Sequence, residues 1–164
     1  MFSLEVSDAP QRAVSFREVL SLVLMLVPFA VALGFLAVHP SVWTEDLASF
    51  FSSEGELIRS DPGWIIASLA IVSGILSAAI GLLGLRERWK YHRRIQRGLI
   101  ASVAAALASI MIGTWTLSAA LDRGEDPNTG LAMFATICCM LYGVLCAAIS
   151  PRDLVDPNAS EYEK

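Results

Sequence analysis

The sequence predicts an all-α integral membrane protein, a bundle of four transmembrane helices. The prediction depends on four long apolar runs, a hydrophobic content of 55% and a mean hydropathy of +0.58. Each run has about the 20 residues that a helix needs to cross a hydrocarbon core of about 30 Å. None contains Asp, Glu, Lys, Arg or His, and charged residues make up only 17% of the chain. The expected helices span residues 19–38, 64–85, 99–121 and 131–149, within a transmembrane domain of residues 19–149.

The first helix is expected to be an uncleaved membrane span that follows a cytoplasmic segment, residues 1–18. This segment is long and mixed in sign, and the apolar run exceeds the length of a signal-peptide core. Ser15 and Glu18 have the spacing of a capping box, which marks the start of the helix. Pro28 interrupts the run near its middle, and we interpret it as a structural kink.

Small residues form a stripe along the second helix, which begins after Asp61 and Pro62. Steps of four and three keep one stripe of a helix aligned, and small side chains let another backbone approach closely. The fourth helix repeats the stripe and the third permits it, so we expect these three to form a core with the first helix partly peripheral. The helix-packing residues are Gly63, Ala67, Ala70, Gly74, Ser77, Gly81 and Gly84 in the second helix and Thr136, Cys139, Gly143 and Cys146 in the fourth.

Basic residues predict the orientation of the bundle. The link between the second and third helices carries six of them, and by the positive-inside rule it is cytoplasmic. Both termini are then cytoplasmic, including the tail of residues 150–164, and the protein is expected to be a multi-pass protein of the cell (plasma) membrane. The six basic residues are expected to contact anionic lipid headgroups or a partner: Arg86, Arg88, Lys90, Arg93, Arg94 and Arg97.

The first outer segment is expected to contain a short amphipathic helix. Trp43, Leu47, Phe50 and Phe51 recur at helical spacing, and Thr44 stands where such a helix would begin. A helix of this kind lies on the bilayer surface, covers the mouth of the bundle as a lid, or docks a partner. We adopt the surface-lying interpretation.

The sequence predicts no catalytic, cofactor-binding or metal-binding residue. The cysteines, Cys138, Cys139 and Cys146, lack the Cys-x-x-Cys spacing of a metal site. His39 and His92 lie at opposite ends of the expected bundle, which excludes a haem held by both. The apolar runs also lack the ionisable groups that mark proton-coupled carriers and membrane hydrolases. Nucleic acid is not expected as a partner, because every basic residue of the link lies close to a membrane helix.

We therefore expect a small polytopic membrane protein without catalytic chemistry and not an enzyme. The leading hypothesis is an accessory or assembly subunit of a membrane complex, or a homo-oligomer. Its expected partners are the lipid bilayer and other membrane subunits or further copies. The alternative is a small permease or channel for a neutral or weakly polar solute, lined by hydroxyl groups. We favour packing over a pathway as the role of these hydroxyl residues: Ser73, Ser77, Ser102, Ser109, Thr116 and Thr136.

Overall fold

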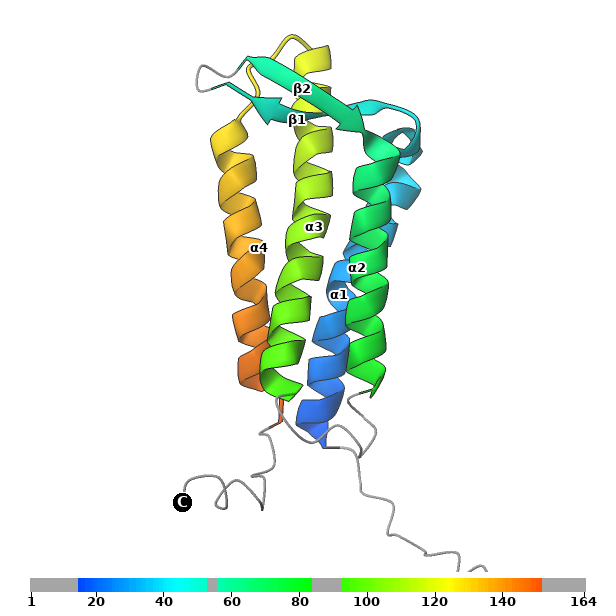
Figure 1. Cartoon of the computed structure of the whole chain (residues 1–164), viewed down its shortest axis with the longest axis vertical. Coiled ribbons are helices and arrows are strands. Elements are labelled where there is room, and N and C mark those ends of the chain that lie inside the picture. The colour runs from blue at the N-terminus through cyan, green and yellow to red at the C-terminus, as the bar shows by residue number, and fades with distance from the viewer. Residues whose placement is uncertain (1–14, 53–55, 84–92, 152–164) are drawn as a thin grey trace, which may run out of the picture.

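Four helices run side by side, and a β-hairpin crosses one end of the bundle (Figure 1). The computed structural model describes residues 15–52, 56–83 and 93–151. All four helices within these ranges are long and apolar enough to cross a membrane, which confirms that part of the predicted fold. The elements are α1 (Phe16–Val38), the 3₁₀ helix η1 (Pro40–Trp43), β1 (Asp46–Phe51), β2 (Leu57–Pro62), α2 (Gly63–Leu83), α3 (Arg93–Asp122) and α4 (Thr129–Ile149).

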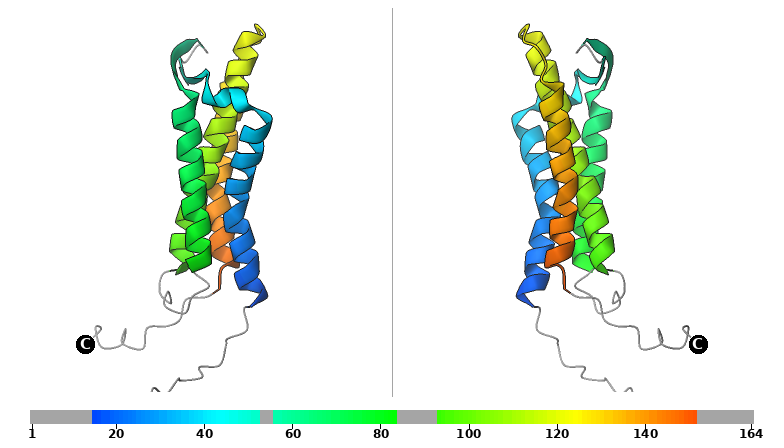
Figure 2. Two further views of the ribbon diagram at one scale, coloured as in Figure 1. Left: turned by 90° about the vertical axis from the view of Figure 1, so that its right-hand side faces the viewer. Right: turned by 90° about the vertical axis from the view of Figure 1, so that its left-hand side faces the viewer.

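The bundle has two distinct ends. Figure 2 shows the start of α1 and the finish of α4 at one end, opposite the hairpin. We call these the terminal end and the hairpin end. At the terminal end α1 begins with the expected capping box, because the Ser15 hydroxyl accepts from the Glu18 amide and the Glu18 carboxylate accepts from the Ser15 amide. The third helix starts at Arg93, six residues before the expected 99, so part of the basic link is helical.

The four helices pack as two pairs joined through α3. The helix α1 packs along α2, α4 packs along α3, and α3 lies between α4 and α2 in Figure 1. The expectation of a peripheral first helix is wrong, because α1 contacts all three other helices and α4 is the least buried helix. The reason is that bulky side chains on α1 fill the space left by small residues on α2. A Cβ on Gly74 would lie 2.9 Å from the Phe29 ring, and one on Gly81 would lie 2.9 Å from Leu22.

The first outer segment forms a hairpin, and the predicted amphipathic helix is wrong. The strands β1 and β2 pair antiparallel, with Leu47 opposite Asp61 and Ala48 opposite Ser60. Leu47 and Ala48 are both buried, and the Ala48 amide donates to the Ser118 hydroxyl of α3 over 2.7 Å. The prediction considered only the spacing of apolar residues within the segment. The segment is a strand because its backbone groups pair with those of residues 57–62.

Gly63 fixes the base of the hairpin at the start of α2. Its amide donates to the Glu45 carbonyl over 2.9 Å, and a Cβ at this position would lie 2.1 Å from the Val42 carbonyl oxygen. No side chain fits so close to a backbone atom, so the residue must be glycine for the chain to turn here. The ring centroids of His39 and Trp115 lie 4.0 Å apart, with the ring planes tilted by 40°.

Candidate functional site

The glycines of the α2 stripe face α1 and the base of the hairpin, whereas Ala67 and Ala70 belong to a buried cluster that also contains residues of α3. Ser77 also donates a hydrogen bond across this interface, to the Met25 carbonyl of α1 over 2.9 Å. A membrane interface of small and bulky residues of this kind is stabilised by close van der Waals contact, with hydrogen bonds of modest strength. The buried members of the stripe are Gly63, Ala67, Ala70, Gly74, Ser77 and Gly81, and Gly84 lies outside the described residues.

The contact between α3 and α4 is closest at Gly143. A Cβ there would lie 2.1 Å from the Gly98 carbonyl oxygen and 1.9 Å from the Ser102 hydroxyl oxygen. Ser102 in turn donates to the Met140 carbonyl over 2.7 Å. Towards the hairpin end Ser109 and Thr136 share a hydrogen bond of 3.3 Å. Of the remaining predicted packing residues of α4, Cys146 is buried and Cys139 is partly buried.

A buried arginine lies at the terminal end among α1, α3 and α4. The Arg97 side chain is 1% exposed, and its Nη1 donates to the Ser21 hydroxyl of α1 over 3.1 Å. The Ser21 and Ser150 hydroxyls share a hydrogen bond of 2.9 Å, and Ser150 donates to the Cys146 carbonyl. We call Ser21, Arg97 and Ser150 the arginine–serine cluster. It joins three helices through one charged side chain.

Arg94, a second basic residue of the link, is less buried than Arg97 and bonds to a backbone carbonyl. Arg94 is partly buried and donates from Nε to the Ala147 carbonyl over 3.1 Å, which satisfies a carbonyl in the last turn of α4. Arg97, expected to contact headgroups or a partner, is buried in the bundle and bonded to Ser21. Arg86, Arg88 and Lys90 lie outside the described residues, and only the backbone of Arg93 is described.

Sequence reasoning missed Arg97 because it stands just before the third apolar run and was assigned to the link. A signal was present. Steps of four and three that run back along the third helix connect the buried residues Met111, Ala108, Ala104 and Ala101, and the next step reaches Arg97.

One cavity opens between α1, α3 and α4 near the middle of their lengths. Its volume is about 540 Å³, and its walls are mainly apolar. Pro28 and Val31 of α1, Ala105 and Ala108 of α3, and Tyr142 of α4 are among its lining residues. A smaller hollow of about 380 Å³ lies between α3 and α4 and reaches the acidic loop at the hairpin end.

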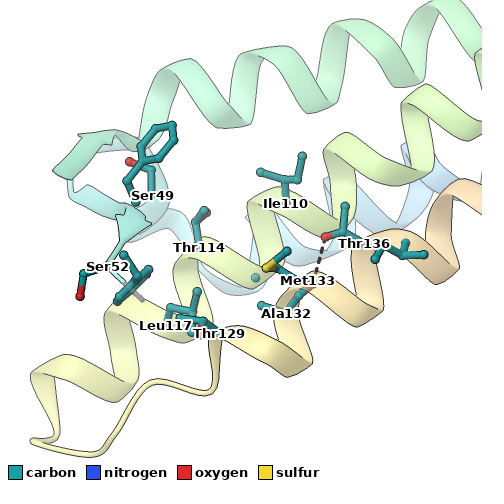
Figure 3. Close-up of a pocket in the computed structure, with 13 residues that line it drawn as sticks. Ser49, Ser52, Ile110, Thr114, Leu117, Thr129, Ala132, Met133 and Thr136 are labelled. Carbon is teal, nitrogen blue, oxygen red and sulfur yellow. Dashed lines mark hydrogen bonds between the residues drawn. The ribbon is translucent and has the colours of Figure 1, made fainter. Parts of the chain in front are cut away.

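A second cavity lies beneath the hairpin, and we call it the hairpin cavity (Figure 3). Its volume is about 420 Å³. Residues 49–51 of β1 and the following Ser52 form one wall. The helix α3 contributes a second wall between Ile110 and Leu117, and α4 contributes a third between Thr129 and Ile137. Its lining is also mainly apolar, but it includes the hydroxyl side chains of five residues: Ser49, Ser52, Thr114, Thr129 and Thr136.

Two charged side chains of β2 make their bonds within the hairpin and link its two strands. Asp61 accepts from the Ser49 hydroxyl over 2.7 Å and pairs with Arg59, which also lies over the Phe50 ring. The bond from Ser49 lowers the pKa of the Asp61 carboxyl, partial burial opposes this, and Arg59 lowers it further. Over the described ranges, no three His, Cys, Asp or Glu side chains are grouped as metal ligands.

No protein-family model, curated protein or solved structure matches the chain. Function is therefore inferred from the geometry of the chain itself. Two features stand out in that geometry: the arginine–serine cluster at the terminal end and the hairpin cavity at the other.

Proposed function

We propose that the protein is a non-enzymatic accessory or assembly subunit of a membrane complex, or one chain of a homo-oligomer. One observation carries the proposal. Each of the six hydroxyl side chains on the helix stripes makes a hydrogen bond to its own helix or to an adjacent one. Four of these hydroxyls take part in bonds between two helices and two bond within their own helix, which is the pattern expected of groups that serve packing.

The permease alternative requires hydroxyl groups that share one lumen. Ser77 bonds to α1, whereas Thr136 bonds to α3 and to its own helix, and Ser73 bonds to the Ala70 carbonyl within α2. Because α3 lies between α2 and α4, these three side chains do not line a common path. The arrangement favours the subunit over the permease.

The buried charge also favours a structural role over catalysis. Arg94 donates to the Ala147 carbonyl of α4, and Arg97 donates to the Ser21 hydroxyl of α1.

We place the terminal end in the cytoplasm of a cell with the protein in its plasma membrane. Arg94 and Arg97 lie at this end, next to the basic link, and the positive-inside rule supports the assignment. The carboxylates of Asp61, Glu125 and Asp126 lie at the hairpin end, which would then face outward.

Photocrosslinking in native membranes tests the subunit proposal. A benzophenone side chain is placed on one exposed apolar position of each helix: Val23, Val72, Val103 and Val144. We expect a protein adduct from one face of the bundle and lipid adducts from the others. Lipid adducts alone at all four positions would contradict the proposal. Two differently tagged copies expressed together distinguish self-association from another subunit.

A further inference from the structure

We propose that the hairpin cavity binds one acyl chain of a glycerophospholipid, with the chain's ester carbonyl bonded to the Thr129 hydroxyl. The inference is independent of the role as a subunit. It begins with the distribution of polarity along the cavity. Ser49, Ser52 and Thr129 lie towards the hairpin and the start of α4, whereas Ile110 and Ile137 lie further along the helices (Figure 3).

The depth of the cavity matches that of a lipid chain. The helix α4 has 21 residues, about 32 Å at 1.5 Å per residue, which is close to the thickness of the hydrocarbon core. Thr129, its first residue, then lies at the boundary between headgroups and hydrocarbon. Ile137 is about 12 Å deeper by the same rise. An acyl chain that enters beside Thr129 and passes Ile137 remains within the hydrocarbon layer.

The chemistry at the mouth selects Thr129 as the contact to an ester. An ester carbonyl only accepts hydrogen bonds, so it requires a donor whose proton is free. Ser49 donates to Asp61, Thr114 to the Met111 carbonyl and Thr136 to the Ala132 carbonyl. The Ser52 hydroxyl is already bonded to the Glu56 amide. The Thr129 hydroxyl makes no hydrogen bond within the part of the chain that the structure describes, and it lines the cavity.

The cavity has room for a chain, and it is closed on the side where α3 meets α4. A Cβ on Gly113 would lie 3.5 Å from the Ala132 Cβ, so α3 and α4 meet there through small residues. The volume of about 420 Å³ falls within the range of about 300–1,000 Å³ typical of ligand sites. The anchored strand β1 covers the cavity, since the Ala48 amide is bonded to Ser118 of α3.

Native mass spectrometry of the full chain tests the site. The protein is reconstituted in vesicles of palmitoyl-oleoyl phosphatidylethanolamine and phosphatidylglycerol and then extracted into detergent. The lipid that stays bound is counted after the protein is released from its detergent micelle in the mass spectrometer. Wild type is expected to retain one phospholipid. Ile137→Trp fills the cavity and should reduce the retained fraction about tenfold. Val144→Trp is the control. Val144 lies two turns beyond Ile137 on the same face of α4, and it lines none of the three cavities described above.

The ester contact has a separate test. Thr129→Val should reduce retention several-fold, and Thr129→Ser should restore it. Dialkyl phospholipids lack the ester carbonyl, so wild type in these lipids should fall to the level of Thr129→Val, with no further loss in the variant. Equal retention by wild type and Ile137→Trp would overturn the proposal, as would equal loss in Val144→Trp. A retained polypeptide in place of the lipid would also overturn it.

Discussion

The Tyr142 hydroxyl of α4 donates a 2.7 Å hydrogen bond to the Leu24 carbonyl of α1. This carbonyl is the one to which residue 28 would donate in a regular helix, and residue 28 is Pro28, which has no amide hydrogen. The side chain of one helix thus satisfies the backbone group that a proline leaves free in another. The proline in α1 and the tyrosine in α4 form one structural unit.

We predict that Tyr142→Phe lowers the free energy of unfolding by about 1 kcal/mol, because it leaves the Leu24 carbonyl without a donor. In a Pro28→Ala background the helix regains its own bond, so the same change should cost close to nothing. Denaturation by sodium dodecyl sulfate in mixed micelles measures both costs. Equal costs in the two backgrounds would show that the tyrosine does not serve the proline.

The glycine at the closest approach of α3 and α4 gives a second prediction. Gly143→Ala should destabilise the protein by about 1–3 kcal/mol, because the new Cβ would overlap the Gly98 carbonyl and the Ser102 hydroxyl. The midpoint of thermal unfolding, followed by circular dichroism, should fall accordingly. Gly34→Ala is the matched control, since no heavy atom lies within 4 Å of a Cβ there. A similar loss in both variants would contradict close packing at Gly143.

The arginine–serine cluster gives a third prediction. Ser21→Ala should cost about 1.5–3 kcal/mol, because it removes an acceptor from a buried charge. The midpoint of thermal unfolding should fall by about 3 to 12 °C. In an Arg97→Met background the charge is gone, and the serine change should have little further effect. Full additivity of the two changes would show that the two side chains are not coupled.

The hairpin gives a prediction about pH. Because the pKa of Asp61 is lowered on folding, its ionised form stabilises the hairpin above the ordinary value of 3.8. This contribution is lost as the pH falls through the folded pKa, which lies below 3.8. A carbon-13 titration of the Asp61 carboxyl should show that midpoint, and Ser49→Ala should move it upward. A wild-type midpoint at or above 3.8 would contradict the assignment.

The helices could be predicted because each apolar run is long and free of charge. The pairing of the helices could not, because a stripe of small residues accepts either another small stripe or bulky side chains. On α1 the latter occurs, with Phe29 and Leu22 packed over Gly74 and Gly81. The sequence therefore indicated the face of α2 that packs but not the helix it meets.

The candidate sites were harder to predict, because each combines residues that are distant in the sequence. The hairpin cavity joins Ser49 of β1 to Thr129 of α4, and it exists only because residues 46–51 pair with β2 and are not helical. The sequence groups Arg97 with the basic link, because the residue stands just before the third apolar run. Its place on the buried stripe of α3 follows from the helical period once the true start of the helix is known.

The proposal that the protein serves as a subunit is tested most directly by its mass in the membrane where it is normally expressed. A tagged full chain is extracted with its surrounding lipid by a nanodisc-forming polymer and measured by native mass spectrometry. We predict a particle that contains at least one polypeptide beyond the 17.7 kDa chain, either another subunit or a second copy. A single 17.7 kDa chain accompanied only by lipid would contradict the proposal.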